Sequence, residues 1–377
     1  MKRRVIISGW VGRGNYGDEL IAYALRRELI RLIRAKTFFY FDTGKVPVSK
    51  DCSDAKIRYL AGRRILRLPN IIIRIYLHFL GTKILVFGGG SIFHSYNSIS
   101  WKLKLSNSFR HKKTSSRIVL ALGVSIGQFD DYRSKELMID FCNNATLISV
   151  RDRRSFQLMS ELGFSSKTVL GLDLAYALAL NEPVFFHRTK QEVTHIGFCI
   201  NGDEFFSRLS KLEQVNFFSL IEYFLRNGTK ITLFNLYNSF ESDDSILIQK
   251  ISSNFSRYKN LYTHSFTGDI RETTHKLGEC THVCSTRLHG LIVADILKLP
   301  IITFSTQRKI RDFLQDSLYG DEVFLNLDSS FKELLDKFEI FLDMEMRSSG
   351  RKQVLHKKKV SMSEQALLSV IGEFHEC

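Results

Sequence analysis

The chain has 377 residues, of which 44% are hydrophobic, and it carries a formal net charge of +15 at pH 7. This length and composition indicate a soluble globular protein of two domains. Its six cysteines are scattered, which excludes a disulfide framework and favours a reducing cytosol. The pair Cys280 and Cys284 lacks the second pair that a metal site would need, so we expect buried free thiols and no bound metal.

Two apolar segments are too short to serve as a secretion signal or a membrane span. The run at 1–10 starts like a secretion signal, but its apolar part stops at Gly9 and a glycine-rich loop follows, which predicts a first β-strand. The longest apolar stretch, 68–80, is interrupted by Arg74 and His78 and cannot span a bilayer. We therefore expect a cytoplasmic protein.

Apolar, β-rich runs alternate with amphipathic stretches of helical spacing along most of the chain. The predicted strands are 5–9, 38–41, 84–87, 118–124 and 147–150, followed by 196–200, 231–236, 282–285 and 301–304. The main helix candidates between them are 19–35, 134–143, 211–226, 244–255, 270–279 and 291–298. Strands alternating with helices predict parallel sheets, and hence doubly wound α/β domains.

The domain boundary is expected where a proline and mixed charges interrupt this pattern, near 181–192. We assign an N-terminal Rossmann-like domain to 1–185 and a C-terminal one to 193–328. Residues 329–377 are predicted as a helical tail, with the basic run 356–359 in a loop. Two open α/β domains facing each other would place a ligand cleft between them, with the site residues at the carboxyl ends of strands.

The positive charge is concentrated in one segment, 55–129, which contains 13 Lys or Arg and no acidic residue, while the rest is nearly neutral. Such a block attracts anions, whether phosphorylated substrates or an anionic membrane. Within it, 56–80 mixes arginines with apolar residues like a basic amphipathic helix at a lipid surface. A solvated helix with an ordinary core face is the alternative. No nucleic-acid-binding module is recognisable, so nucleic acid is not an expected partner.

The segment 284–290 is the strongest candidate site in the second half. It follows a predicted strand and opens a predicted helix, which places Arg287 and His289 at the positive end of that helix, with Ser285 or Thr286 as its cap. Backbone N–H groups, a helix dipole and a guanidinium together bind anions. A neighbouring imidazole can transfer protons near neutral pH. The alternative is an ordinary cap with a solvated arginine.

The glycine-rich loop 12–17 matches the G-x-G-x-x-G pattern of dinucleotide sites, and Asp42 ends the next strand. However, Asp18 and Glu19 lie where a pyrophosphate would approach the helix N-terminus, and they would repel it. We therefore do not expect a dinucleotide. Asp18 is a candidate site carboxylate, with a structural cap as the alternative.

Two further motifs follow strands in the first half. Gly88, Gly89 and Gly90 allow positive φ and a close approach, either by a ligand or by a neighbouring loop. Arg151 and Asp152 begin an Arg-Asp-Arg-Arg-Ser motif that suits an anion clamp, with Asp152 positioning an arginine. A charged helix start is an equally good interpretation of that motif.

Together these motifs resemble one family, the polysaccharide pyruvyl transferases. The ordered matches extend from about Val5 to Leu314 and comprise 14–19, 88–90, 123–127, 148–155, 171–175 around Asp173, 287–290 and Lys309. The resemblance implies a glycosyltransferase-B-like (GT-B-like) fold of two Rossmann-like domains facing a cleft, with the acceptor on the N-terminal side and the donor on the C-terminal side. It also implies transfer of a pyruvyl group from phosphoenolpyruvate to two hydroxyls of a sugar. The product is a pyruvate ketal on a precursor of a cell-surface or exopolysaccharide, and no cofactor is implied.

The family pattern assigns roles to individual residues. It places Arg287, His289 and Lys309 in the donor site. The arginine of the family's Arg-Asp-x-x-Ser motif corresponds to Arg151, which the resemblance therefore also assigns to donor binding. The three cations suit the carboxylate and phosphate of phosphoenolpyruvate. His289 is the candidate acid that protonates C3 of phosphoenolpyruvate. Asp18 is the candidate base, or the group that positions a sugar hydroxyl. The remaining residues expected in the site loops are Asn15, Gly17, Gly88, Gly89, Gly90, Asp152 and Gly290.

Two departures from the family pattern leave the acceptor sugar open. Relatives often have Gly-Pro where this chain has Gly127 and Gln128, and residues 91–94 differ from the commoner sequence. The basic segment 56–80 suits a lipid-linked acceptor at the inner membrane face, with the protein bound peripherally. The alternative functions are a GT-B-type glycosyltransferase that uses a nucleotide sugar and a non-catalytic scaffold for polysaccharide assembly.

Overall fold

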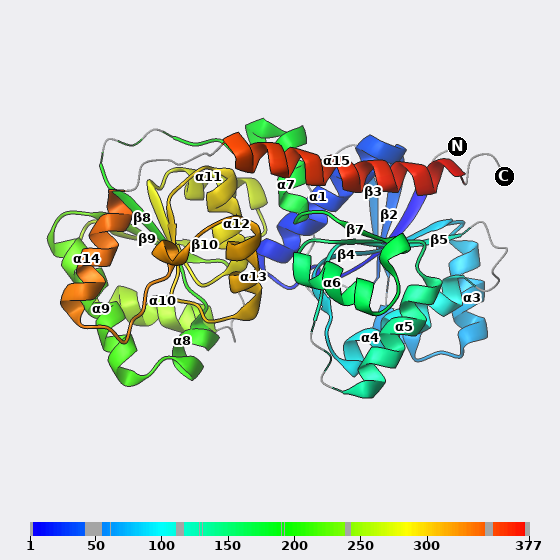
Figure 1. Cartoon of the computed structure of the whole chain (residues 1–377), viewed down its shortest axis with the longest axis horizontal. Coiled ribbons are helices and arrows are strands. Elements are labelled where there is room, and N and C mark those ends of the chain that lie inside the picture. The colour runs from blue at the N-terminus through cyan, green and yellow to red at the C-terminus, as the bar shows by residue number, and fades with distance from the viewer. Residues whose placement is uncertain are drawn as a thin grey trace. The chain divides into compact units, whose positions relative to one another are not determined.

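The chain folds into two compact units, each built around a parallel sheet (Figure 1). Unit 1 comprises residues 1–13, 18–180 and 354–377, and unit 2 comprises residues 14–17 and 181–353. The computed structural model describes residues 3–41, 55–60, 62–110, 117–127, 129, 131–189, 191, 193–237, 243–343 and 350–373. Four residues of the N-terminal glycine loop therefore belong to unit 2, and the C-terminal end of the chain belongs to unit 1.

Unit 1 contains a seven-stranded sheet in the order β3-β2-β1-β4-β5-β6-β7, with every described pairing parallel. Its strands are β1 (Arg3–Ser8), β2 (Ala35–Phe41), β3 (Lys56–Leu60), β4 (Ile84–Phe93), β5 (Ile118–Ile126), β6 (Leu147–Val150) and β7 (Thr168–Leu170). Its helices are α1 (Tyr16–Ile33), α2 (Gly62–Leu66), α3 (Asn70–Phe79), α4 (Tyr96–Phe109), α5 (Tyr132–Asn144), α6 (Arg153–Glu161), α7 (Leu174–Asn181) and α15 (Gly350–Glu373).

Alternate residues of the first strand enter opposite cores of unit 1. Val5 and Ile7 pack in one cluster with Leu29 of α1 and Leu367 of α15. Ile6 lies in the other cluster, which helices α3, α4 and α5 cover. Because side chains alternate between the faces of a strand, an uninterrupted apolar run needs helices on both faces. The strand therefore folds into the centre of a doubly wound sheet.

Unit 2 contains a five-stranded parallel sheet in the order β10-β9-β8-β11-β12. The strands are β8 (His195–Cys199), β9 (Lys230–Asn235), β10 (Leu261–Ser265), β11 (His282–Ser285) and β12 (Ile301–Ile302). The helices are α8 (Gly202–Arg208), α9 (Lys211–Arg226), α10 (Asp243–Asn254), α11 (Ile270–Gly278), α12 (Leu288–Ile296), α13 (Arg308–Asp316) and α14 (Phe331–Leu342). Cys280 and Cys284 are buried free thiols in this unit.

The predicted amphipathic helix 56–80 is wrong over its first part. Residues Lys56–Leu60 form strand β3, which pairs in parallel with β2, and only 62–66 and 70–79 are helical. The physical reason is an alternation of basic and less polar residues that has the two-residue period of a strand. Pro69 then stands at the N-cap of α3, where the missing N–H costs nothing.

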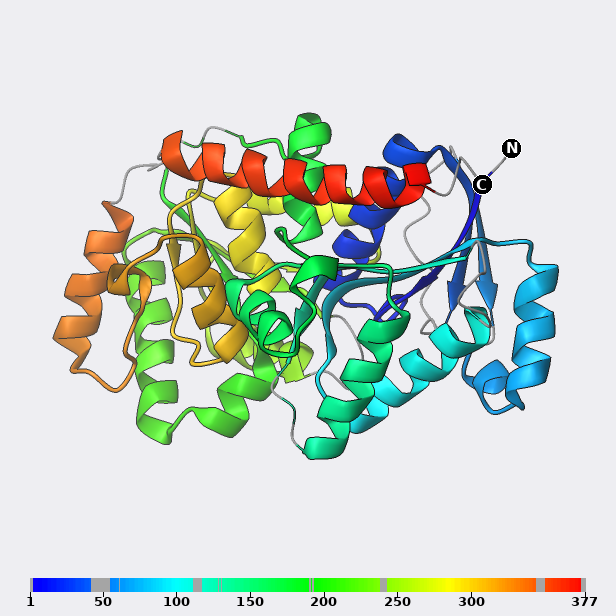
Figure 2. The ribbon, with the colours of Figure 1, turned by 45° about the vertical axis from the view of Figure 1, so that its right-hand side comes forward.

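The predicted helical tail is divided between the two units. Helix α14 packs on unit 2, where Phe338 contacts Phe224 at a ring distance of 4.8 Å. Helix α15 packs on unit 1 beside α1 and α7, as Figures 1 and 2 show. The basic run 356–359, predicted as a loop, lies inside α15 because Val360 and Leu367 are buried against unit 1.

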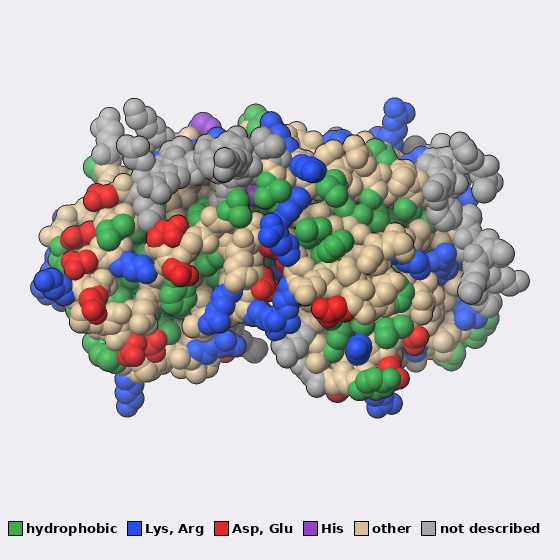
Figure 3. Space-filling model, viewed as in Figure 1, with side chains coloured by type: hydrophobic (Ala, Val, Ile, Leu, Met, Phe, Trp, Pro, Cys, Tyr) green, Lys and Arg blue, Asp and Glu red, His purple; other side chains and the backbone are tan. Residues whose placement is uncertain are grey.

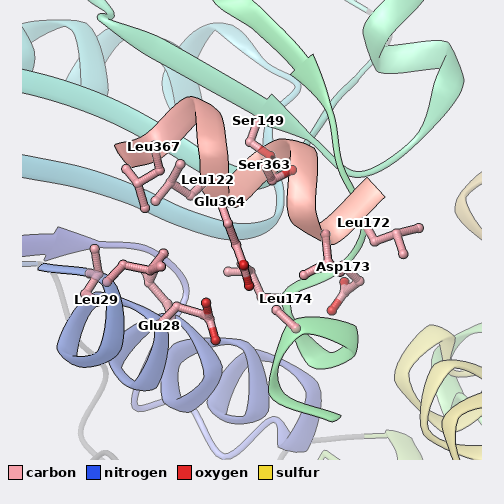
Figure 4. A pocket seen from close by; sticks show the side chains of 14 residues that line it. Glu28, Leu29, Leu122, Ser149, Leu172, Asp173, Leu174, Ser363, Glu364 and Leu367 are labelled. Atoms are coloured by element: carbon pink, nitrogen blue, oxygen red, sulfur yellow. Dashed lines mark hydrogen bonds between the residues drawn. The ribbon is translucent and has the colours of Figure 1, made fainter. Parts of the chain in front are cut away.

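A largely apolar pocket lies where α15 meets α1, α7 and the end of β6 (Figure 4). Figure 4 shows Ser149 and Ser363 pointing toward one another, and their hydroxyl oxygens are 3.2 Å apart. Arg31 of α1 joins α15 through an ion pair with Glu364 at 2.5 Å, and it also pairs with Glu28 of its own helix at 2.7 Å. These contacts hold α15 to unit 1. Within the described part of the chain, no helix combines the length and hydropathy needed to cross a bilayer.

Candidate functional site

The turn between β11 and α12 presents Arg287 at the N-cap of α12. The predicted caps are wrong, because neither hydroxyl caps this helix. Ser285 Oγ accepts the Arg287 N–H at 3.0 Å, and Thr286 Oγ1 accepts the Asn201 N–H at 2.7 Å. Ser285 Oγ also donates to the Cys199 carbonyl at 3.1 Å, so both hydroxyls hold the turn at the end of β8 and neither bonds to the first turn of α12.

Gly290 lets α12 pack closely on the sheet. A Cβ at this position would lie 2.4 Å from Ser285 Oγ and 2.9 Å from the Cβ of Cys199. No side chain fits at such distances, so the glycine of the Arg-Leu-His-Gly sequence is required by packing. Its role is to place Arg287 and His289 against the carboxyl ends of β8 and β11.

The guanidinium of Arg287 is anchored by Asp244, at the start of α10. Nε donates to Asp244 Oδ2 at 2.9 Å, Nη2 donates to Oδ1, and the guanidinium lies 5.6 Å from the ring of Tyr237. Asp244 also accepts the Gly202 N–H at 2.8 Å. The Asp244 side chain is 1% exposed and that of Arg287 18%, so the pair is largely desolvated yet retains one accessible edge. Such a bidentate pair fixes the orientation of the guanidinium.

Sequence reasoning missed Asp244. It lies in a run of acidic and serine residues after β9, and nothing in that run distinguishes it from a solvated helix start. The signal exists only in three dimensions, because the start of α10 meets the β11–α12 turn through the sheet order β9-β8-β11.

The segment 14–17 completes this site from the other end of the chain. Asn15 forms an antiparallel bridge with Tyr237, and the Tyr16 N–H donates to the Leu236 carbonyl at 2.8 Å. Tyr16 is fully buried, and its hydroxyl lies 2.7 Å from Thr274 Oγ1. Burial raises the pKa of this phenol, so it stays neutral. Tyr16 thus anchors the segment to unit 2.

His289 lies directly beside the backbone of Gly17. A Cβ on Gly17 would be 2.0 Å from His289 Nδ1 and 2.4 Å from Cγ. The Gly17 N–H in turn donates to Asn15 Oδ1 at 3.0 Å. The structure therefore brings together Asn15, Gly17, Arg287, His289 and Gly290, five of the residues that the sequence singled out.

Lys309 is exposed and lies in the first turn of α13, which follows β12 and contacts α12. The loop before it is held by a buried carboxylate, Glu204. Ser305 Oγ and Gln307 Nε2 donate to Glu204 at 2.7 and 2.8 Å. Because β11 and β12 are adjacent parallel strands, Lys309 and Arg287 both follow the same edge of the sheet.

Arg151 belongs to unit 1, where it is held by its neighbours. Its Nη1 pairs with Asp173 Oδ2 at 2.8 Å, and its Nε donates to Ser125 Oγ at 2.7 Å. Ser125 Oγ donates to Asp152 Oδ2 at 2.6 Å, and Asp152 Oδ1 caps α6 by accepting the Ser155 N–H at 2.7 Å. Asp152 therefore begins a helix and also orients Arg151 through a serine, and the anion clamp stays a prediction.

The triple glycine lies within β4, where a loop after the strand was predicted. A Cβ on Gly88 would lie 2.3 Å from Leu25, and one on Gly89 would lie 1.9 Å from Ile21, both in α1. Gly89 and Gly90 also have positive φ, at 61° and 77°. The close approach is therefore made by α1, and it allows Asp18 to lie next to Gly90. Asp18 is half-buried.

Gly127, which directly precedes one departure from the family pattern, lies next to His94, which belongs to the other. A Cβ on Gly127 would be 2.6 Å from the Cβ of His94, and the Gly127 N–H donates to the Phe93 carbonyl at 2.7 Å. His94 and Gly127 therefore form one local surface at the carboxyl ends of β4 and β5. Gln128 lies outside the described residues.

The dinucleotide-like loop is occupied by a side chain of its own helix. Glu19 Oε1 accepts the Gly12 N–H at 2.5 Å, and Glu19 is 1% exposed. Burial, with a smaller contribution from the charge of Asp18, raises the pKa of Glu19 to about 7. The carboxyl group thus takes the backbone donor that a pyrophosphate would need. Asp42 lies outside the described residues.

Glu19→Gln should remove a pH dependence of stability. In wild type the folded state holds its proton up to about pH 7, whereas the unfolded state releases it near 4.5, so stability falls as the pH rises between these values. The full cost, about 3 kcal/mol, is present above pH 7. The variant should therefore be more stable at about pH 8 and similar to wild type at about pH 4. Urea unfolding at both pH values measures this, and an equal pH slope in both proteins would contradict it.

Comparison with solved structures identifies the fold class. Similar structures include UDP-GlcNAc 2-epimerases from Methanocaldococcus jannaschii and Neisseria meningitidis, the latter bound to UDP-GlcNAc, and Anabaena Alr3699/HepE in complex with UDP and glucose. In that order, their TM-scores are 0.61, 0.64 and 0.55, and their sequence identities are 12%, 9% and 10%. The matches cover 97%, 98% and 99% of this chain, and 98%, 100% and 98% of the respective neighbour. The chain has the GT-B-like fold, as predicted.

The family follows from a second comparison. The model of the polysaccharide pyruvyl transferase family matches residues 15–308. The chain therefore belongs to the polysaccharide pyruvyl transferase family, which confirms the resemblance. A search among curated proteins gives no significant match. The matched range contains the Arg287–His289 turn and ends one residue before Lys309.

Proposed function

We propose that the protein is a transferase that moves the pyruvyl group of phosphoenolpyruvate onto two hydroxyls of a sugar and forms a pyruvate ketal. The observation that carries this proposal is the β11–α12 turn, where Arg287, fixed by Asp244, and His289, beside Gly17, share one helix N-terminus. Family membership supports the same reaction class. A fixed guanidinium at a helix N-terminus suits a carboxylate or phosphate.

The reaction needs one proton donor and two hydroxyl nucleophiles. His289, as an imidazolium, protonates C3 of phosphoenolpyruvate, and positive charge develops at C2. A sugar hydroxyl forms a bond to C2 and releases its proton. The bond from C2 to the phosphate oxygen breaks, and phosphate leaves with its electron pair. The second hydroxyl then closes the ketal as it loses its proton. Of the two hydroxyl protons, one restores the imidazolium of His289 and the other leaves with the phosphate. The products are the ketal and inorganic phosphate.

The other cations have separate roles in this proposal. Arg287 holds the donor, and Lys309 in α13 contributes the second positive charge. Arg151 is committed to Asp173 and Ser125, so we assign it to positioning the carboxyl ends of β5, β6 and β7. Asp18, beside Gly90, is the proposed group that orients an acceptor hydroxyl or accepts its proton. No cofactor takes part.

We propose that the acceptor is a lipid-linked sugar in a precursor of a cell-surface polysaccharide, modified at the cytoplasmic membrane face. The surface formed by Gly127 and His94 is the proposed place of acceptor selection, because the chain departs from its family at residues 91–94 and directly after Gly127. Replacing these positions should change acceptor preference more than donor affinity.

Calorimetric titration with phosphoenolpyruvate tests the donor assignment. Wild type should show saturable binding that is lost in Arg287→Ala, because the variant lacks the anchored guanidinium. The matched control is Arg226→Ala in α9, whose arginine is exposed and paired only with surface groups among the described residues. The control should bind like wild type.

The same titration includes a panel of nucleotide sugars, because two alternatives make other predictions. Binding of a nucleotide sugar without phosphoenolpyruvate would contradict the proposal and support a glycosyltransferase. Full activity of a variant lacking both Arg287 and His289 would support a non-catalytic scaffold.

A further inference from the structure

Helix α3 presents an apolar stripe to solvent. Ile71, Ile75 and Phe79 are 58%, 50% and 79% exposed, and Leu68 and Ile72 are exposed beside them. At helical spacing these residues fall within one arc of about 100°. A contiguous exposed stripe of this kind on a folded protein marks an interaction surface.

The folding of unit 1 does not account for this stripe. The inward face of α3 is formed by Ile73 and Leu77, which are fully buried in the core under the sheet. Lys104 fixes the turn between α2 and α3, because its Nζ donates to the Leu66 carbonyl at 2.8 Å. The helix is therefore held firmly with its outward face available for a partner.

The basic residues around α3 indicate which kind of partner its exposed face binds. Arg64 and Arg67 precede the helix, Lys83 follows it, and all three are exposed. Residues 55–129 contain no acidic residue. Figure 3 shows basic and hydrophobic side chains at the edge of unit 1 where Figure 1 places α3. Apolar side chains flanked by cations match a surface with apolar depth and negative headgroups.

We infer that α3 lies in the headgroup region of an anionic phospholipid bilayer, with Ile71, Ile75 and Phe79 inserted. A second copy of the chain fits less well, because pairing this face with itself would bring like charges together. The inference does not depend on the proposed reaction, since lipid binding is measured without either substrate.

Co-sedimentation of the full-length protein with vesicles tests the inference. Wild type should bind phosphatidylcholine vesicles that contain phosphatidylglycerol and should bind pure phosphatidylcholine vesicles only weakly. Its binding to the anionic vesicles should weaken in about 1 M salt, where the Debye length is about 3 Å. The triple variant Ile71→Ser, Ile75→Ser, Phe79→Ser should bind at least roughly tenfold more weakly. Arg64→Glu with Arg67→Glu should have a comparable effect, at roughly fivefold or more for each charge.

Matched controls make equal changes on unit 2. Leu212→Ser with Val215→Ser and Ile340→Ser removes three apolar side chains that are 54%, 59% and 60% exposed. Lys211→Glu with Lys332→Glu makes the same charge change as the double arginine variant. Both controls should bind like wild type, and unchanged circular dichroism reports that each variant is folded.

Equal losses in the α3 and control variants, or equal binding to neutral and anionic vesicles, would overturn the inference. So would a wild-type dimer that the triple variant converts to a monomer in light scattering, because the stripe would then belong to a self-association surface.

Discussion

Replacing His289 by glutamine should lower turnover by about 10²- to 10⁴-fold while phosphoenolpyruvate still binds. Glutamine keeps a polar side chain of similar reach at the start of α12, but it cannot deliver a proton to C3. The loss should therefore appear in kcat. The dependence of kcat on protonation of the catalytic acid should disappear. Steady-state kinetics across pH, with calorimetry for donor affinity, measures both effects.

Gly17→Ala tests the position of the His289 imidazole without changing its chemistry. A methyl group there would fall 2.0 Å from His289 Nδ1, so the imidazole has to move, although its chemistry is intact. We expect a fall in kcat smaller than that of His289→Gln, with the pH profile retained. Wild-type turnover in either variant would contradict the assignment of His289 as the acid. Unchanged circular dichroism serves as the control for folding.

Replacing Arg287 by lysine should weaken phosphoenolpyruvate binding by roughly 10- to 100-fold, although the positive charge remains. Lysine cannot form the two parallel contacts that the guanidinium makes with Asp244, so the cation is no longer held at one orientation. Calorimetry measures the change in Kd.

Asp244→Asn separates the anchor from the ligand contact. Asparagine can still accept the Gly202 N–H, but it leaves a largely buried guanidinium without its counter-charge. We expect weaker donor binding together with a lower free energy of unfolding. Donor affinity equal to wild type in both Arg287→Lys and Asp244→Asn would contradict the proposed donor site.

The central strands of both sheets were predictable, and most edge strands were not. Strands β1, β4 and β8 are apolar runs buried on both faces, so their sequences carry a continuous signal. The strands that sequence reasoning missed, β3, β7 and β10, each lie at the edge of a sheet. An edge strand is partly solvated, so polar residues interrupt its apolar pattern; β10, for example, reads Leu-Tyr-Thr-His-Ser.

From local patterns alone, the candidate site was predictable only where its residues are close in sequence, and the family resemblance added Asn15 and Gly17. Arg287, His289 and Gly290 form a local signal of strand, turn and helix. The contribution of Asp244 and the contact between Gly17 and His289 depend on sheet order and on a long-range return of the chain. No local pattern encodes such contacts, because they arise only when separate segments fold together.

The assignment of residues 14–17 to unit 2 has a consequence for protein engineering. Chimaeras that exchange the N- and C-terminal halves between family members would ordinarily be joined near residue 181. Such a junction would pair the transplanted His289 with a foreign loop, because Tyr16 and its partner Thr274 are 258 positions apart in the chain. A functional chimaera therefore has to take residues 14–17 from the same parent as its C-terminal half.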